Sequence, residues 1–167
     1  MFNKRNNEIG DDGVYAVGVA LRKFKNLEKL ELWLYQNQFG DRGVSGIVTG
    51  LTSCTQIKKL QLGIGNNKIT DEGYLRLDQC LASLVNLQSL LYGFTSCNEK
   101  ILKSRDLLNC KNIKILTLNY EPMLTKRERI SHKIKAFKIL RLVRLEVIEY
   151  QEPQHPEDEY ENYEHFE

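Results

Sequence analysis

Four cysteines and three histidines are the residues of this sequence best suited to bind a metal or to form a nucleophile and its base. They are Cys54, Cys80, Cys97, Cys110, His132, His155 and His165. The ligand spacings of zinc sites are missing, because no Cys-x-x-Cys or Cys-x-x-His pattern occurs. No serine or cysteine is matched with a histidine and an acid, and no glycine-rich loop has a phosphate-binding form. The sequence therefore predicts no enzyme, no metal site and no cofactor.

Eight basic side chains crowd the segment 126–144, in which Glu128 is the single acid. They are Lys126, Arg127, Arg129, Lys133, Lys135, Lys138, Arg141 and Arg144. This basic patch could follow nucleic-acid phosphates, form a solvated helix face and strand, or attract the acidic tail or an acidic partner. Nucleic acid is the least favoured interpretation, because stacking aromatics are not interleaved with the charges. The other two stay open.

The formal net charge of +2 combines a basic body with an acidic tail. Residues 151–167 hold seven acids and no Lys or Arg, which leaves residues 1–150 with 24 basic and 15 acidic side chains, a formal charge of +9. The tail has no aliphatic residue, so it cannot bury enough surface to offset its ordering entropy, and we expect it to be disordered. Tyr160, Tyr163 and Phe166 recur every third residue, which keeps a short docking peptide as the alternative.

A thirty-residue repeat organises the body of the chain. The pattern NEIGDDG at residues 7–13 recurs as NQFGDRG at 37–43 and as NKITDEG at 67–73. Leucines and isoleucines precede the second and third copies at alternating positions, so the unit reads LxxLxLxLxxNx(I/F)xDxG and is followed by apolar residues at helical spacing. Fixed spacing of this kind predicts one strand and one helix per unit.

Each part of the repeat has a physical role. Alternating leucines such as Leu30, Leu32 and Leu34 describe a strand with one face in the core. The asparagine can hydrogen-bond backbone groups that have left the strand ladder. The aspartates, Asp11, Asp41 and Asp71, are expected to cap the helices that follow them.

The repeat also explains the cysteines. Cys54 and Cys110 occupy a slot that Phe24 and Leu84 fill in other units, which marks it as an apolar core position. Only Cys97, in a degraded part of the pattern, is expected to be exposed. The cysteines are therefore predicted to be reduced thiols, mostly in the core.

The pattern decays toward the C-terminus. A third strand follows Leu87, a fourth begins near Ile113, sooner than the repeat spacing predicts, and a fifth is predicted around Leu145. At the other end, Phe2 falls in the slot of Leu32, so the chain starts inside a strand. With no polar segment to shield that edge, either the chain is part of a longer solenoid or a partner covers the edge, through possible edge-to-edge contact at the uncapped N-terminal strand.

These residues resemble the leucine-rich-repeat family, in its ribonuclease-inhibitor-like branch. The resemblance is clearest over residues 7–120 and continues to residue 148. It implies an α/β solenoid in which parallel strands line a concave face, helices cover the convex face, and protein ligands are gripped on the concave side. We therefore divide the chain into a leucine-rich-repeat domain (1–150) and an acidic disordered tail (151–167).

The predicted concave face contains the candidate binding site. Between the buried leucines, Trp33 and Tyr35 point outward beside Gly63 and Gly65 of the next strand, about 5 Å away. Either Trp33 packs over this glycine gap as structure, or the gap leaves its ring open to a partner, since Trp and Tyr dominate interface energetics. The candidate partner-binding residues are Glu31, Trp33, Tyr35, Lys59, Gln61, Leu91, Thr117 and Asn119.

These expectations favour a non-catalytic protein-interaction module, a scaffold or subunit of a larger assembly. The alternative is a regulator, an inhibitor or activator, of an enzyme such as a small GTPase or a nuclease, which rests on fold analogy alone. No apolar run is long enough to cross a membrane and no secretory signal precedes the repeats, so a cytoplasmic location is expected.

Overall fold

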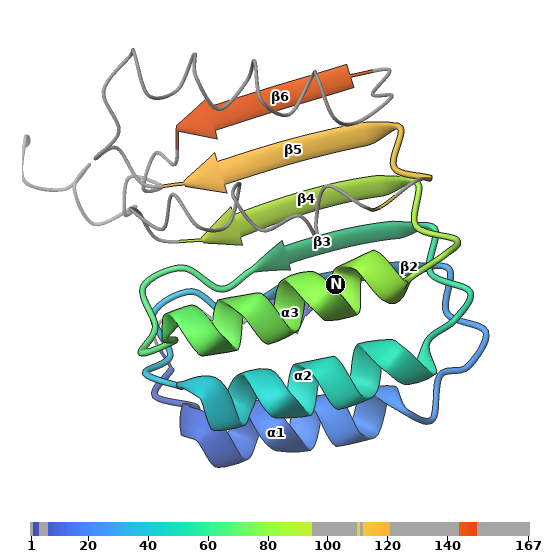
Figure 1. Ribbon diagram of the computed structural model, residues 1–167. Coiled ribbons are helices and arrows are strands. Elements are labelled where there is room, and N and C mark those ends of the chain that lie inside the picture. Colours follow the sequence, from blue (N-terminus) through green and yellow to red (C-terminus); the bar gives the residue numbers. More distant parts are fainter. Residues whose placement is uncertain (1, 4–6, 95–109, 111, 121–143, 150–167) are drawn as a thin grey trace, which may run out of the picture.

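The computed structural model describes residues 2–3, 7–94, 110, 112–120 and 144–149 (Figure 1). Its strands are β1 (Phe2–Asn3), β2 (Lys29–Trp33), β3 (Lys59–Gly63), β4 (Ser89–Phe94), β5 (Ile115–Tyr120) and β6 (Arg144–Glu149). Its helices are α1 (Gly10–Leu21), α2 (Asp41–Ser53) and α3 (Asp71–Ser83). The six strands form one parallel sheet in chain order, and the three helices lie side by side along one of its faces (Figure 1). The predicted α/β class is confirmed.

Strand pairing follows the repeat. Leu30 pairs with Leu60 and Leu60 with Leu90, so the sheet advances by one repeat unit per strand. The number of residues between paired positions is smaller where Leu90 pairs with Leu116. It is almost the full repeat length again where Leu116 pairs with Leu145. Phe2 pairs with Leu32, as its slot in the repeat predicts.

Several features singled out in the sequence lie outside the described residues. They are the basic patch apart from Arg144, which opens β6, the three histidines, Cys97 and the acidic tail. The predictions made for these segments stay predictions.

The core lies between the sheet and the helices. Alternate residues of β2 to β5 point to the helix side of the sheet, and Leu32, Leu62 and Leu90 are fully buried there. The helices contribute residues at spacings of three and four, such as Ile47 and Leu51 of α2. Each such side chain stabilises the fold by roughly 1.5–3 kcal/mol when it leaves water.

Asparagines link the units just beyond the strands. The Asn7 backbone N–H donates to Asn37 Oδ1 at 3.1 Å, and the Asn37 N–H donates to Asn67 Oδ1 at 2.8 Å. The Asn67 amide also donates to the carbonyl oxygens of Leu34 and Ile64, each at 2.8 Å. The predicted role of these asparagines is therefore correct, and it extends from one unit into the next.

Asp11 and Asp41 hydrogen-bond the following unit rather than their own helices, so the expectation that they cap those helices is wrong. The N-cap of α3 is Thr70, directly before Asp71. Asp11, in α1, accepts hydrogen bonds from the backbone N–H groups of Gly40 (2.8 Å) and Gly43 (2.7 Å) at the start of α2. Asp41, in α2, accepts from the N–H (2.9 Å) and the hydroxyl (2.6 Å) of Thr70, the N-cap of α3. Asp11 thus caps α2, whereas Asp41 holds Thr70, whose own hydroxyl caps α3 by accepting from the Glu72 N–H. Both links form because stacking brings the next helix start within reach of the carboxylate.

The glycine of each Asp-x-Gly pattern makes room for this carboxylate. A Cβ on Gly73 would overlap Asp41 Oδ1, and a Cβ on Gly43 would lie 3.1 Å from Asp11 Oδ1. The aspartate of one unit and the glycine of the next therefore form a matched pair.

Helices α1 and α2 approach each other through further glycines. A Cβ on Gly18 would overlap the carbonyl oxygen of Gly46, one on Gly46 would overlap the Cα of Tyr15, and one on Gly50 would overlap the carbonyl oxygen of Gly18. Any side chain larger than hydrogen at these positions would force the helices apart.

Candidate functional site

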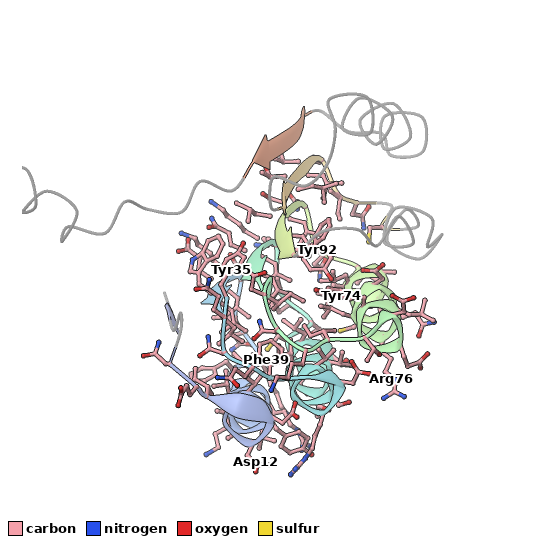
Figure 2. All side chains as sticks on the ribbon, turned by 90° about the vertical axis from the view of Figure 1, so that its left-hand side faces the viewer. Asp12, Tyr35, Phe39, Tyr74, Arg76 and Tyr92 are labelled. Atoms are coloured by element: carbon pink, nitrogen blue, oxygen red, sulfur yellow. The ribbon has the colours of Figure 1, made fainter. Side chains whose placement is uncertain are left out.

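The face of the sheet turned away from the helices carries the predicted binding residues. Tyr35 lies on this side of the strands, opposite Tyr74 and Tyr92, which lie on the helix side (Figure 2). Strand pairing aligns the outward positions into rows across the sheet. One row holds Glu31, Gln61, Leu91 and Thr117, and the next holds Trp33, Gly63, Gly93 and Asn119. We call this surface the open face.

Aromatic rings lie over Gly63 and Gly93 on the open face. A Cβ on Gly63 would overlap the ring of Tyr35 and lie 2.6 Å from Cε3 of Trp33. A Cβ on Gly93 would overlap the Tyr35 hydroxyl. The Tyr35 ring therefore extends from the end of β2 across β3 to β4, and only glycine at both positions permits this path.

This geometry corrects the alternative in which the glycine gap leaves the Trp33 ring open on that side, because the Tyr35 ring lies over Gly63. The rings of Trp33 and Tyr35 stack with centroids 6.1 Å apart and planes inclined by 14°. Tyr35 is only 6% exposed, so it offers little contact area and instead supports its neighbour. Trp33 stays half-buried, with part of its side chain open to solvent. Tyr35 thus changes from a predicted contact residue to a supporting one.

Charged groups stand beside the aromatic pair. Lys29 Nζ lies 2.8 Å from Glu31 Oε1, and the Glu31 side chain is 18% exposed. The hydrogen bond from Lys29 holds the pKa of Glu31 below its ordinary value, and the charges of Lys29 and Lys59 act in the same direction against the cost of burial. Glu31 therefore stays ionised near neutral pH, and the stabilisation from this pair is lost as the pH falls through the lowered pKa.

Apolar side chains continue the open face toward β5. Leu91 and Gln61 are half-buried, Ile115 is 39% exposed, and Thr117 is buried at 7%. Sequence reasoning missed Ile115, although its signal was present, because the outward slot that it fills holds Lys59 and Ser89 in the preceding units. Asn119 is placed by its backbone in β5, paired with Gly93.

Four ionisable groups on the helix side are buried, namely Cys54, Cys80, Tyr92 and Cys110. Burial, followed by the nearby charge of Asp78, raises the pKa of the Cys110 thiol to about 12. Burial and the same carboxylate raise the pKa of Tyr92 well above its usual value. Burial also raises the pKa values of Cys54 and Cys80. These three thiols are the reduced core residues that their slots predict.

Asp78 was missed by sequence reasoning. It is 1% exposed and lies on the buried stripe of α3, between Leu77 and Leu81. The sequence did contain a signal for this residue, because Gly18 and Val48 fill the same slot in the two preceding helices and an acid there is unusual.

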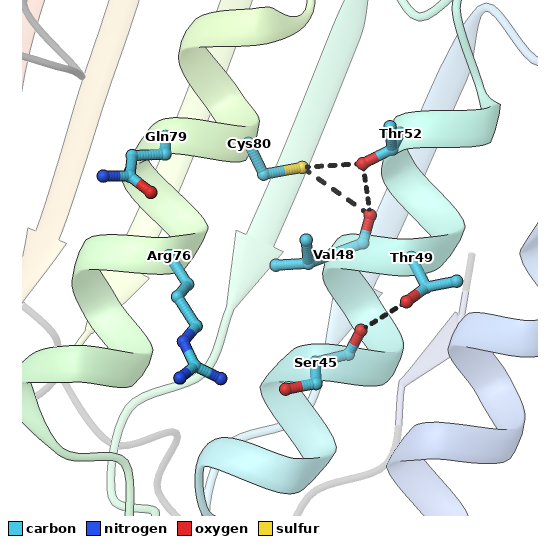
Figure 3. Close-up of a pocket in the computed structure, with 7 residues that line it drawn as sticks. All are labelled: Ser45, Val48, Thr49, Thr52, Arg76, Gln79 and Cys80. Carbon is cyan, nitrogen blue, oxygen red and sulfur yellow. Dashed lines mark hydrogen bonds between the residues drawn. The ribbon is translucent and has the colours of Figure 1, made fainter.

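A groove of about 380 Å³ separates α2 from α3 (Figure 3). Gly46 and Gly50 of α2 allow α2 to lie close to α1. In α3 the same slots hold Arg76 and Cys80, whose side chains keep α3 farther from α2 and leave the groove. The residues that line it are Ser45, Val48, Thr49, Thr52, Arg76, Gln79 and Cys80.

Several polar groups of the groove are hydrogen-bonded within or between the two helices. The Thr49 and Thr52 hydroxyls donate to backbone carbonyl oxygens four residues earlier, at 2.8 and 2.7 Å, and Arg76 Nε donates to Glu72 at 3.1 Å. The Cys80 thiol donates to the Val48 carbonyl oxygen at 3.8 Å. No strong nucleophile with an adjacent base lines the groove among these residues.

Within the described residues, no cluster of histidine, cysteine or acidic side chains could hold a metal ion. None of the described helices has the length and apolar character needed to cross a membrane. The chain matches no family model, no curated protein and no solved structure. Function is therefore inferred from the geometry of the open face.

Proposed function

We propose that this chain is a leucine-rich-repeat solenoid of the ribonuclease-inhibitor-like kind, and that it works as a non-catalytic protein-interaction module or assembly subunit. The regular register of the first strands, the links between units and the position of the helices on one face support this fold. In such a solenoid the open face is the concave surface, which is where we place the partner.

The observation that carries this proposal is that Tyr35 and Gly63 support the ring of Trp33. Its indole is held by stacking on Tyr35 and by contact with Gly63, while part of the side chain remains in water. A ring fixed in this way loses little conformational entropy on binding, which is the property of aromatic anchors in interfaces. Gly63 and Gly93 leave the space that the two rings need on this face.

The surroundings of Trp33 define the chemistry of the partner. Leu91 and Ile115 supply an apolar contact area across the strands, and the pair of Lys29 and Glu31 supplies a charged rim. An apolar centre with a polar rim is the usual anatomy of a protein interface. We therefore expect the partner to contribute an apolar side chain over Trp33 and polar groups near the starts of β2 and β3.

The full chain carrying Trp33→Ala tests the proposal. Proteins retained from a cell extract by the wild-type chain would be identified, purified and titrated against both forms. Tyr15→Ala is the matched control, because Tyr15 is 41% exposed and lies on α1, away from the open face.

We expect Trp33→Ala to weaken binding at least tenfold, about 1.4 kcal/mol, and Tyr15→Ala to leave it unchanged. Equal affinities for wild type and Trp33→Ala, or equal losses in both variants, would refute binding through this face.

A further inference from the structure

Positive charge is in excess on the described part of the open face. The hydrogen bond from Lys29 and the charge of Lys59 both lower the pKa of Glu31, so this single acid stands between two cations. None of the described acids forms an ion pair with Lys59, which is exposed at the start of β3. The open face can therefore accept a further negative group beside Lys59.

Apolar surface lies next to this charge. The Trp33 ring is stacked on Tyr35 and stays partly in water, Leu91 is half-buried, and Ile115 is 39% exposed. An occupant that fits this surface combines negative charge with aromatic side chains, which can stack on the indole and cover the aliphatic groups.

The acidic tail of this chain has that composition. Residues 151–167 contain seven acids and no Lys or Arg, and they follow a body with a formal charge of +9. Their three recurring aromatic side chains are Tyr160, Tyr163 and Phe166. The tail lacks the aliphatic residues with which a segment builds a core of its own, so its aromatic rings need an apolar surface supplied from outside.

The position of β6 brings the tail within reach of the aromatic pair. The strands are parallel, so Trp33 at the end of β2 and Glu149 at the end of β6 lie at the same edge of the sheet (Figure 1). Pairing places Ile148 in the row of Trp33, four strands away. At about 4.8 Å per strand this separation is about 19 Å.

The length of the tail is sufficient for this distance. Tyr160 comes eleven residues after Glu149, and a segment of that length spans up to about 36 Å. Each of the three aromatic residues can therefore reach Trp33. Because the tail is tethered, its effective concentration at the open face is about 1 mM. A contact that would be weak for a free peptide is then formed much of the time.

From these features we propose that the acidic tail binds the open face of its own chain, with an aromatic side chain on Trp33 and a carboxylate beside Lys59. The tail thereby competes with the protein partner, which has to displace it. The inference deepens the proposed function and rests on it, since it assigns a regulator to the same binding surface.

The fluorescence of Trp33 in the full chain tests the proposal without any partner, because this residue is the only tryptophan. Quenching by acrylamide, a neutral molecule, measures how much of the ring is accessible. If the tail covers the ring half of the time, removing its aromatic side chains should raise the quenching constant about twofold. The test variant combines Tyr160→Ala, Tyr163→Ala and Phe166→Ala.

A matched control changes the same number of tail residues and keeps every aromatic ring and acid. It combines Gln151→Ala, Gln154→Ala and His155→Ala, and its quenching constant should equal that of the wild type. Circular dichroism checks that both triple variants retain the wild-type fold.

Charge reversal tests the contact from the side of the open face. Lys59→Glu should raise the quenching constant of the wild type about twofold and should add nothing to the aromatic triple variant. Lys114→Glu is the control, because Lys114 is also exposed but precedes the outward-facing Ile115 and so belongs to the other side of β5. It should leave the constant unchanged. Added salt should raise the constant of the wild type and not that of the aromatic triple variant.

Equal quenching constants in the wild type and the aromatic triple variant would overturn the proposal. Equal effects of Lys59→Glu and Lys114→Glu would do the same, because the tail would then respond to basic charge in general. Protection that grows with protein concentration would overturn docking within one chain. The partner titration with Trp33→Ala is a separate measurement, so a negative quenching result leaves the proposed function standing, and a negative titration leaves the tail contact standing.

Discussion

Replacing Gly46 with alanine tests the glycine contact between α1 and α2. In an unconstrained helix this change stabilises by about 1 kcal/mol, because alanine restricts the unfolded chain and favours helix. Here the new Cβ would overlap the Tyr15 Cα and lie 3.0 Å from the Tyr15 carbonyl oxygen. Both obstacles are backbone, so no rotamer change can relieve them.

The two effects can be weighed against each other. Extra carbon in a packed site costs about 1–3 kcal/mol, and the upper end applies where a whole helix must shift. Subtracting the gain of about 1 kcal/mol leaves a net loss of roughly 2 kcal/mol, which for a chain of this length lowers the melting temperature by about 4–8 °C.

Thermal and urea unfolding of Gly46→Ala measure this loss. The matched variant is Arg76→Ala, one unit later in the same slot, where the side chain borders the groove and is exposed. It should change stability by less than about 0.5 kcal/mol. If Gly46→Ala raises the melting temperature instead, the close approach of α1 and α2 is wrong.

Three further changes probe other parts of the molecule. Asp41→Ala removes both hydrogen bonds to Thr70, the cap of α3, and should cost about 1–2 kcal/mol in urea unfolding. Asp12→Ala, at an 81% exposed side chain, should cost less than about 0.5 kcal/mol, and equal losses would contradict the stabilising link between units. The free energy of unfolding should stay level from neutral pH to about 9, the ordinary pKa range of thiols, and then fall up to about pH 12. The reason is that Cys110 keeps its proton in the folded state over this range, while the thiol of the unfolded chain ionises. A free energy of unfolding that is constant up to pH 12 would refute this. In a Cys97→Ser background the remaining thiols should react with a disulfide reagent only as fast as the chain opens, and full reaction within the mixing time would show that they are accessible.

Strand register could be predicted from the sequence because it depends on a property that each unit displays by itself. The alternation of leucines sets which side of a strand faces the core, and the repeat spacing sets which residues pair. Even Phe2 could be placed in this way, because it falls in the slot of Leu32. The buried cysteines followed from the same reasoning, since a slot filled by Phe24 and Leu84 elsewhere is apolar.

Contacts between units could not be predicted so readily. Asp41 stands at the start of its own helix, and the local pattern is that of an ordinary cap. That its carboxylate reaches Thr70 instead depends on the offset between stacked units, which no single unit displays. The path of Tyr35 over Gly63 and Gly93 is similar, because it involves three strands at once. Sequence reasoning identified Tyr35 and Gly63, but it placed the ring beside the glycine rather than over it.

The links between units also limit where the chain can change in length. Between the second and third units, the Asn37 backbone N–H donates to the side chain of Asn67, and the side chain of Asp41 accepts from the backbone N–H of Thr70. An insertion or deletion within such a unit would break both links at once. After β4 the sequence has Cys97 in the asparagine slot and no Asp-x-Gly pattern, and here the spacing between paired strands becomes shorter than the repeat. The shorter spacing therefore coincides with the part of the sequence that lacks the residue types of these links. In variants of this chain, insertions between residues 95 and 109 should be tolerated, whereas a single added residue between Asn37 and Gly43 should disrupt two units.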